Sequence, residues 1–420
     1  MSGRARLLAA VVPLLALAAC GGGKATSTST AGPPAPPFPV VRRAPHLVAP
    51  WVSTRGGRFV DATGHTVLLR GVDVTLTPPP DYSQAVALHA NFVRIVAPWS
   101  LFEPTAPTGS THHWDAATLR QLDAEVTYFE QHRVNVLIDF HQFHWSPYFA
   151  GHHCRQSGKC TARGIPAWYY ADGRFPDSGR GERAAEQAFW TTEARSSQAA
   201  YAAFAAMIAT RYARYPNVVG YEIFNEPHPG NLGDTTAATD AMLGWQVRIR
   251  NVLRTVDPTR TVFVMCRGGG EGVGTANLAL FGSLDHLALD WHDYYNGRPG
   301  GGLDAAGDNW VPSWPATHNQ QTASYTGTLA NQQAVMSKIV ARARFWKVPL
   351  LVGEWGVHTG SPGSAAYQSQ MLTLFDRYGV SYARWALTAG GGFGLLTGSG
   401  GSTPEGLQLA AALAANPSPR

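Results

Sequence analysis

Cysteine is scarce in this chain, with 4 among 420 residues. Cys154 and Cys160 flank a short polar stretch and form no recognised zinc-binding spacing. Outside the cell, a local disulfide between them is the expected arrangement. The alternative is a zinc site that combines them with His141 or His144. Cys266 ends an apolar segment and is expected to be a buried free thiol.

Charged residues are also few, at 15% of the chain, and the formal net charge is +5. The basic residues are scattered along the sequence, so nucleic acid is not an expected partner. The run Gly268-Gly269-Gly270 is not followed by Gly-Lys-Ser/Thr, which excludes a phosphate-binding loop of that type. These features argue against nucleic-acid binding and against nucleotide binding by a P-loop.

Long hydrophobic runs are absent after residue 19. The run before it, residues 7–19, follows a basic start and is too short to remain in a bilayer as a spanning helix. Leu17-Ala18-Ala19-Cys20 resembles a bacterial lipobox, which implies cleavage before Cys20 and attachment of lipid to its thiol. An ordinary cleaved signal peptide is the alternative.

The N-terminal pattern predicts the domain organisation. We expect residues 1–19 to be a lipoprotein signal peptide and residues 20–48 to be a flexible linker, because they are rich in Gly, Ser, Thr and Pro. Residues 49–420 would then form one catalytic domain. This organisation predicts an extracytoplasmic protein, either anchored to the bacterial cell membrane by lipid on Cys20 or secreted.

Hydrophobic residues make up 45% of the chain and occur in short runs typical of buried parallel strands. The expected strands are residues 66–72, 91–96, 135–139, 218–224, 261–265, 287–291, 349–353 and 381–385, the first of them preceded by a hairpin from residue 57. Amphipathic stretches between them predict helices at residues 115–132, over most of 182–215, and at 240–256.

Eight alternating strand and helix units predict an α/β fold, a (β/α)8 TIM barrel with an N-terminal β-hairpin. A doubly wound open sheet is the alternative, but it would not account for eight strands and the hairpin. Loops at residues 140–181 and 293–325 leave the carboxyl ends of strands and are expected to wall the site. Aromatic residues expected at its mouth are Trp99, Phe143, Trp145, Trp168, Tyr169, Tyr170, Trp310 and Trp314.

Two glutamates follow buried runs directly. One is in Asn225-Glu226-Pro227 and the other is in Gly353-Glu354-Trp355-Gly356. In a parallel barrel both would open on the same face. Cleavage of a glycosidic bond needs two carboxyl groups, one to protonate the leaving oxygen and one to attack or to activate water. The two phrases therefore predict a glycosidase site.

Other polar residues stand near the ends of the expected strands. In chain order, with the glutamates and the aromatic residue of the last strand, they are Arg94, Asp139, His141, Gln142, Asn225, Glu226, His292, Tyr294, Glu354 and Trp385. This ordered set resembles glycoside hydrolase family 5, in clan A of the retaining glycosidases, over about residues 55–415. The resemblance implies a retaining O-glycosyl hydrolase that works by double displacement without metal or organic cofactor.

The resemblance also implies a role for each side chain. Glu226 would be the acid/base and Glu354 the nucleophile. Burial and the charge of Glu354 are expected to raise the pKa of Glu226. Arg94 and Tyr294 are expected to bond to Glu354. Asn225 would bond the sugar 2-hydroxyl. The sugar subsite would be lined by His141, His292 and Trp385.

The substrate is expected to be a β-linked glucan or a related glycan, as for a cellulase-like endo-β-1,4-glucanase acting as a monomer. The phrase at residues 136–142 resembles the endoglycoceramidase-like branch, although Phe143 stands where that branch usually has an acidic residue. A glycolipid hydrolase is therefore an alternative. Two others are a non-catalytic carbohydrate-binding surface lipoprotein and a metal-dependent hydrolase built on His141, His144, His152 and His153.

Overall fold

The computed structural model describes residues 44, 46–76, 78–158, 161–191, 195–270, 284–294, 325, 327–389 and 392–415. All of them belong to one compact unit, Pro36–Arg420. The expected signal peptide, Cys20 and most of the expected linker lie outside the described residues. Cys160, Trp310 and Trp314 lie outside them as well.

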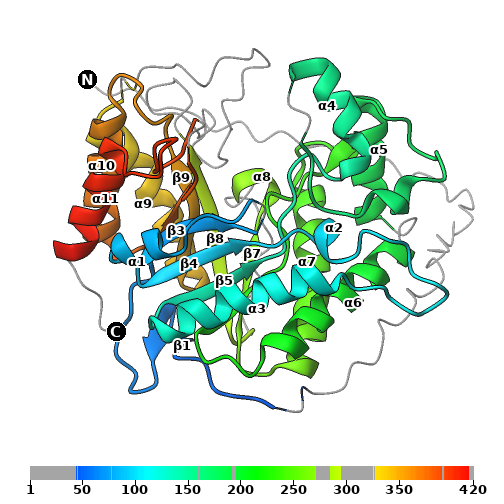
Figure 1. The fold of residues 1–420 in the computed structure, drawn as a ribbon, viewed down its shortest axis with the longest axis horizontal. Helices are drawn as coiled ribbons and strands as arrows, with labels where there is room; N and C mark the ends of the chain where they lie inside the picture. Colours follow the sequence, from blue (N-terminus) through cyan, green and yellow to red (C-terminus); the bar gives the residue numbers. More distant parts are fainter. Residues whose placement is uncertain are drawn as a thin grey trace, which may run out of the picture. The chain divides into compact units, whose positions relative to one another are not determined.

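Eight parallel strands close into a barrel (Figure 1), which confirms the predicted (β/α)8 fold. The strand order around the barrel is β10-β3-β4-β5-β6-β7-β8-β9, and β10 pairs with β3 to close it. The strands are β1 (Val52–Arg55), β2 (Arg58–Asp61), β3 (Arg70–Thr75), β4 (Phe92–Val96), β5 (Asn135–Asp139), β6 (Val218–Glu222), β7 (Thr261–Met265), β8 (Leu287–Tyr294), β9 (Leu350–Gly356) and β10 (Ser381–Arg384).

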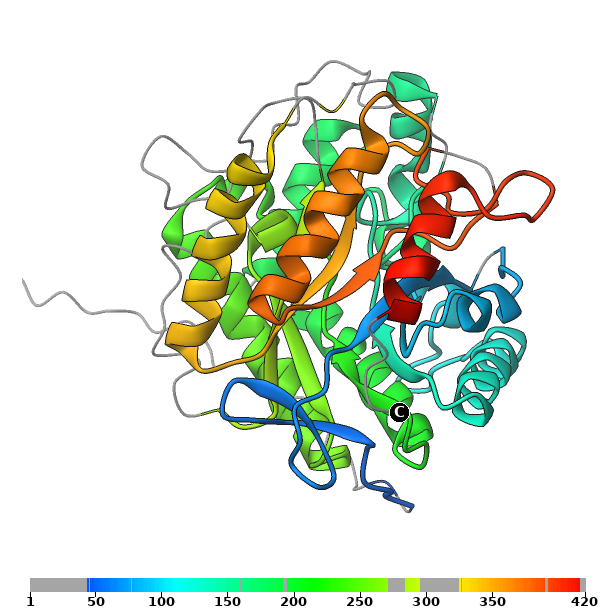
Figure 2. The ribbon, with the colours of Figure 1, turned by 90° about the vertical axis from the view of Figure 1, so that its left-hand side faces the viewer.

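Helices cover the outside of the barrel, and Figure 2 shows α9, α10 and α11 side by side in this layer. In the described residues the helices are α1 (Ser83–Ala87), α2 (Trp99–Phe102), α3 (Ala116–Gln131), α4 (Ala150–Ser157), α5 (Gly179–Trp190), α6 (Arg195–Tyr212), α7 (Thr236–Val256), α8 (Arg267–Gly270), α9 (Leu329–Trp346), α10 (Ser364–Tyr378) and α11 (Pro404–Ala415). None of them is long and apolar enough to cross a membrane.

Helix α3 shows how local sequence sets the helix boundaries. The side chain of Asp115 accepts a hydrogen bond from the backbone N–H of Thr118 at 2.7 Å, which satisfies one of the free donors of the first turn. Leu122, Val126 and Phe129 recur at helical spacing and are buried against the barrel. The observed helix agrees with the expected helix at residues 115–132.

The stretch expected to be largely helical at residues 182–215 contains two helices, α5 and α6. The hairpin expected from residue 57 is present, since the N–H of Val67 donates to the carbonyl oxygen of Phe59 at 2.9 Å. A further strand, β1, precedes it, and Gly56 and Gly57, with φ values of 57° and 77°, form the tight turn between β1 and β2. The barrel strand after it, β3, accordingly begins at Arg70.

The hairpin covers the amino-terminal end of the barrel (Figure 2). Its Val52 and Phe59 belong to a buried cluster with inward-facing residues of the strands, and the ring of Phe59 stacks on Phe263 of β7 at 5.7 Å. This apolar layer closes one end of the barrel interior. The chemistry is therefore confined to the carboxyl end, where the interior residues are charged.

Candidate active site

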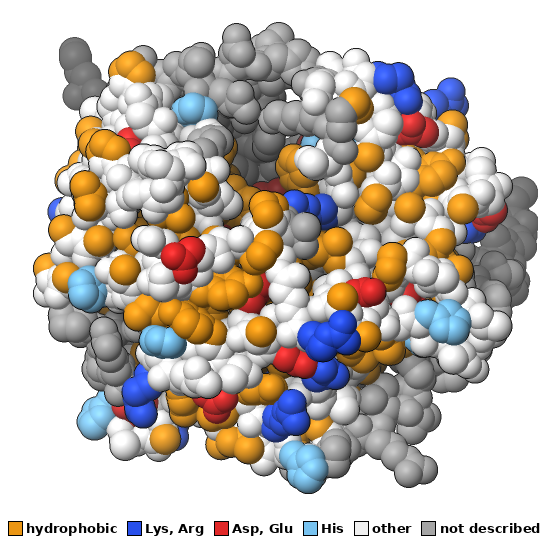
Figure 3. Space-filling model, viewed as in Figure 1, with side chains coloured by type: hydrophobic (Ala, Val, Ile, Leu, Met, Phe, Trp, Pro, Cys, Tyr) orange, Lys and Arg blue, Asp and Glu red, His pale blue; other side chains and the backbone are white. Residues whose placement is uncertain are grey.

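Both predicted glutamates lie at the carboxyl end of the barrel. Glu354 is in β9, where it is paired in register with His292 of β8. Glu226 lies in the loop that follows β6. On the face drawn in Figure 3, acidic side chains are visible at depth in a hollow close to the position of α8, the helix that follows β7.

Glu354 has two polar partners, and both were expected from the sequence. Its Oε1 accepts a hydrogen bond from Nη1 of Arg94 at 2.8 Å, and its Oε2 accepts one from the hydroxyl of Tyr294 at 2.7 Å. Gly353 brings the strand close to its neighbour, because a Cβ there would lie 2.2 Å from Oδ2 of Asp290. Each carboxylate oxygen of Glu354 is thus fixed by a different strand.

Arg94 is fully buried and lies among acidic side chains of several strands. Its Nε donates to Glu222 at 2.6 Å, and its Nη1 donates to Asp73 at 3.0 Å. Asp139 lies 3.1 Å from Nη2. Arg94 has no exposed surface, and its expected hydrogen bond to Glu354 is present. It acts on the site through Glu354 and the neighbouring carboxyl groups.

The sequence reasoning missed Asp73, Glu222 and Asp290, which complete this buried charged layer. Each interrupts an apolar run inside a barrel strand, and that pattern was the available signal. All three are fully buried. A buried charge needs a partner of opposite charge. Arg94 was the only cation that the sequence analysis had identified inside the barrel.

The acidic side chains around Arg94 differ in the direction of their pKa shifts. Burial raises the pKa values of Asp73, Asp139 and Asp290 well above the usual range, although the charge of Arg94 opposes this shift. For Glu222, burial also raises the pKa, but the charge and hydrogen bonds of Arg94 outweigh it and the net shift is downward. In this layer the charge of Arg94 therefore favours the ionised form of Glu222, whereas burial favours the neutral forms of the three aspartic acids.

Glu226 is paired with His292. Its Oε1 lies 2.8 Å from Nδ1 of His292, and its side chain is 23% exposed, in contrast to the buried imidazole. Gln142 supports the backbone here, because its side-chain amide donates to the carbonyl oxygens of Asn225 and Glu226 at 3.0 and 2.7 Å. Glu226 itself has a φ of 40°, a left-handed conformation that is uncommon for a non-glycine residue.

The expected raised pKa of Glu226 was wrong. Burial raises this pKa, but the hydrogen bond and charge of His292 outweigh burial and lower it to about 2. Burial lowers the pKa of His292, but the charges of Glu354 and Glu226 outweigh this and raise it to about 10. At neutral pH the pair therefore holds one proton, and that proton is on His292.

The two catalytic candidates are close enough to act on one bond. One carboxylate oxygen of Glu226, one of Glu354 and one ring nitrogen of His292 all lie within 4.8 Å of one another. Such a set could in principle hold a metal ion, as could Glu222, Asp290 and His292. A protonated His292 hydrogen-bonded through Nδ1 offers no lone pair there, so the arrangement fits acid/base chemistry better.

Three further predicted residues lie around this pair. Asn225 is buried, its Oδ1 accepting from Arg94 at 2.7 Å and its Nδ2 donating to the backbone of Gln142 at 2.9 Å. The ring of His141 stacks on Trp385 with centroids 5.8 Å apart, and Trp385 is partly exposed. Burial is the main reason that the pKa of His141 is lowered to about 4, so this imidazole is neutral.

Several aromatic residues expected at the mouth belong to the core instead. Trp99, Trp145 and Tyr170 are buried, at most 2% exposed. The indole of Trp145 donates to the hydroxyl of Tyr170 at 2.7 Å. Trp168 is partly buried and packs edge-on against Trp99 at 6.1 Å. Trp99, Trp145 and Tyr170 therefore stabilise this part of the fold by packing and are too buried to stack on a sugar.

The cysteines and the histidines that follow β5 were expected to form a disulfide or a metal site, and the structure places them as follows. Cys154 is disulfide-bonded, and its expected partner Cys160 lies outside the described residues. Cys266 is a buried free thiol, as expected. His141 lies in the active site, where Nδ1 is hydrogen-bonded to Asp139 at 2.7 Å. Of the histidines in the segment, His144 and His153 lie together beside Glu182 of α5.

Comparison with known proteins identifies the family. The sequence model described as cellulase (glycosyl hydrolase family 5) matches residues 60–391. No curated protein sequence matches the chain.

Solved structures share the fold. Endo-glycoceramidase II from Rhodococcus sp., in a complex with ganglioside GM3, is 21% identical with a TM-score of 0.64, covering 86% of this chain and 81% of that one. An endogalactoceramidase is 21% identical with a TM-score of 0.61, covering 81% and 75%. The cellulose synthase subunit Z from Clostridioides difficile is 16% identical with a TM-score of 0.55, covering 82% and 99%.

Proposed function

The chain belongs to glycosyl hydrolase family 5 and is an O-glycosyl hydrolase, and we propose that it cleaves a β-linked glucan or a related glycan with retention of configuration. Glu354 is the nucleophile and Glu226 the acid/base in this proposal. The observation that carries it is the pair of carboxylate oxygens within 4.8 Å of each other at the carboxyl end of the barrel. Retaining enzymes place their carboxyl groups about 5–5.5 Å apart, whereas inverting enzymes leave room for a water.

In the first step, Glu354 attacks the anomeric carbon and the bond to the leaving oxygen breaks. Hydrogen bonds from Arg94 and Tyr294 favour the ionised nucleophile and orient its two oxygens. The amide of Asn225 has one more N–H than its bond to Gln142 uses. That N–H is available to bond the sugar 2-hydroxyl, a contact that strengthens in the transition state.

The leaving oxygen must receive a proton as the bond breaks. In the proposed mechanism this proton comes from the pair of Glu226 and His292, whose reacting atoms are 2.8 Å apart. It passes from Nδ1 of His292 to Glu226, and Glu226 delivers it to the leaving oxygen. Glu226, now ionised, accepts a proton from the water that attacks the anomeric carbon and releases the sugar from Glu354. This proton returns from Glu226 to Nδ1 of His292, which restores the starting pair.

A glycolipid is the second candidate substrate. It is favoured by the likeness to endo-glycoceramidase II, whose solved structures include a ganglioside GM3 complex and cover 86% of this chain. Phe143 argues for the glucan, because it stands where the glycolipid-cleaving branch has an acidic residue. A non-catalytic sugar-binding role is disfavoured, since both carboxylates are present and paired with the side chains that catalysis requires.

We further propose that the enzyme acts as a monomer outside the cytoplasm and that lipid on Cys20 anchors it to the cell membrane. The support is the sequence Leu17-Ala18-Ala19-Cys20 after an apolar stretch. Membrane fractionation of cells producing the natural chain and a Cys20→Ala variant tests the anchor. The natural chain should sediment with membranes, and the variant should not.

The proposed function is tested with aryl β-glycosides, β-glucans, mannans and a glycosphingolipid, beside a Glu226→Ala variant with and without azide. Cleavage of one class identifies the substrate. Azide should restore turnover of an activated aryl glycoside by the variant, because a small anion replaces water and needs no general base. NMR of the first product should show the β anomer; the α anomer, or no cleavage by folded protein, would refute the proposal.

A further inference from the structure

A second cluster of ligand-type side chains lies outside the active site, in the segment after β5. His144 follows that strand, His153 lies on α4, and Glu182 lies in the first turns of α5. One ligand atom from each of the three lies within 4.8 Å of the other two. The cluster therefore joins three chain segments at one point.

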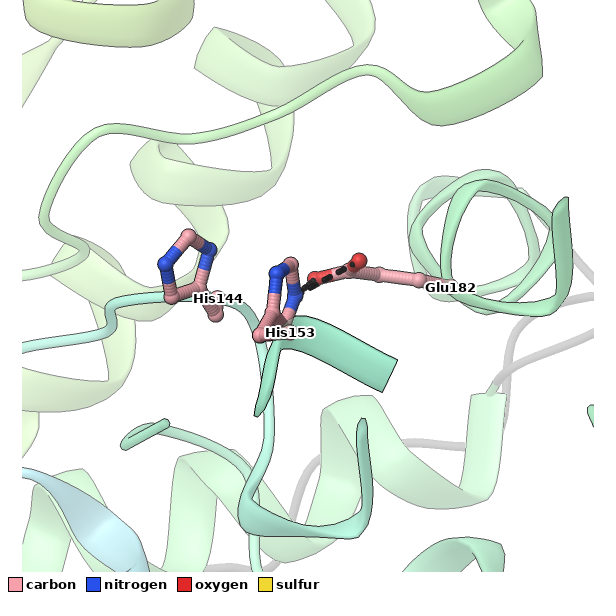
Figure 4. Close-up of side chains that lie close together, drawn as sticks. All are labelled: His144, His153 and Glu182. Carbon is pink, nitrogen blue, oxygen red and sulfur yellow. Dashed lines mark hydrogen bonds and ion pairs between the residues drawn. The ribbon is translucent and has the colours of Figure 1, made fainter. Parts of the chain in front are cut away.

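His153 and Glu182 contact each other directly. Nε2 of His153 lies 3.0 Å from Oε1 and 2.9 Å from Oε2 of Glu182. The rings of His144 and His153 are stacked, with centroids 3.6 Å apart and planes inclined by 24°. Figure 4 shows the two imidazoles side by side, with the carboxylate reaching His153 from α5. The His153 and Glu182 side chains are only 12% and 11% exposed.

We propose that His144, His153 and Glu182 bind one Zn²⁺ ion, with water as the fourth ligand. Two imidazoles and a carboxylate are a common zinc ligand set, and they suit Mg²⁺ or Ca²⁺ poorly. In tetrahedral zinc sites with bonds of about 2.0–2.1 Å, neighbouring ligand atoms are roughly 3.3 Å apart. The separations here are at most 4.8 Å, so small side-chain rotations bring the ligands into range.

The ion would act on the structure that carries Glu226. His144 lies two residues after Gln142, whose side chain bonds to the carbonyl oxygens of Asn225 and Glu226. Helix α5 packs against the short turn that follows Glu226, where a Cβ on Gly230 would lie 2.2 Å from the backbone of Arg183. Zinc would therefore stabilise the segment after β5 and α5 together, without taking part in bond cleavage.

Zinc binding is measured by calorimetry on metal-free full-length protein, with the melting temperature recorded in parallel. A Glu354→Gln background is used, because it removes one competing ligand set, Glu226, His292 and Glu354. The other competing set, Glu222, Asp290 and His292, is fully buried. We expect one Zn²⁺ per chain and a higher melting temperature with zinc. His153→Ala and His144→Ala should each weaken binding more than about tenfold.

The matched control is His112→Ala. His112 is paired with Glu103 at 2.6 Å but belongs to none of the three possible metal-ligand groups in the described residues, so its loss should leave zinc binding unchanged. Glu182→Gln keeps the shape of the side chain, and weaker zinc binding by this variant would support the proposal even if an alanine variant failed to fold. The proposal is refuted by the absence of binding, or by binding that none of the three ligand substitutions weakens.

Discussion

Replacement of Arg94 by methionine should destabilise the fold through the charge that it leaves behind. Arg94 and Glu222 are both fully buried and share two hydrogen bonds, at 2.6 and 3.1 Å. Methionine fills part of the space but leaves Glu222 without its cation. Loss of one partner of a buried pair typically costs about 3–5 kcal/mol, so the free energy of unfolding should fall by that amount.

Without Arg94, the buried Glu222 avoids an unpaired charge by taking up a proton. The free-energy cost of that protonation determines how far the free energy of unfolding falls and how the fall depends on pH. Protonation of a glutamate with an ordinary pKa of about 4.3 costs about 4 kcal/mol at pH 7 and about 1 kcal/mol at pH 5. In the natural protein, burial raises the pKa of Glu222, but Arg94 lowers it more strongly. Glu222 is therefore ionised in both the folded and the unfolded state between pH 5 and pH 7. In the variant the folded state binds one proton more than the unfolded state, so its deficit grows as pH rises.

Urea unfolding of Arg94→Met and natural protein at pH 5, 6 and 7, followed by tryptophan fluorescence, measures this difference. The deficit should increase by about 1.4 kcal/mol per pH unit. Arg174→Met is the control, because its pair with Asp172 is about half exposed, at 52% and 50%, and should contribute at most about 1 kcal/mol. A deficit below about 1 kcal/mol at pH 7, or one that does not change with pH, would refute the reasoning.

Three further substitutions test the site. Glu354→Gln should lower kcat/KM on an aryl β-glycoside by at least about a thousandfold in a protein that still folds, since the covalent step loses its nucleophile; activity within tenfold of the natural enzyme would contradict the assignment. Glu226→Gln should lower the pKa of His292 from about 10, measured by histidine ¹⁵N NMR, and an unchanged pKa would show that the pair is not coupled. Gly353→Ala should cost about 1–3 kcal/mol, because the new Cβ would lie 2.2 Å from a carboxylate oxygen of β8, whereas Gly398→Ala, with nothing within 4 Å, should be neutral in the same urea assay.

The barrel was predictable because its signals are local. Each buried run is short, and the helix at residues 115–132 begins at a capping aspartate and repeats its apolar residues at helical spacing. Strand β1 was missed because Gly56-Gly57 was not recognised as a turn, although two glycines suit the left-handed conformations that such a turn requires.

The site was predicted in part. The pairing of Glu354 with Arg94 and Tyr294 was expected from the resemblance to glycoside hydrolase family 5 and is present. Trp99 and Trp145 were placed at the mouth because aromatic residues crowd that part of the sequence. The sequence does not distinguish an aromatic ring that packs under a loop from one that faces the cleft, and both indoles are buried.

The sequence by itself determined the order of strands and helices, and with it the placing of two glutamates at one end of a barrel. Only the tertiary structure decided which charged groups pair at that end and how their pKa values shift. Arg94 meets Glu222 and Glu354 from distant parts of the chain, and His292 meets Glu226 at 2.8 Å. A pKa depends on the charges and burial within a few ångströms in space. Residue order fixes those distances only once the barrel has closed.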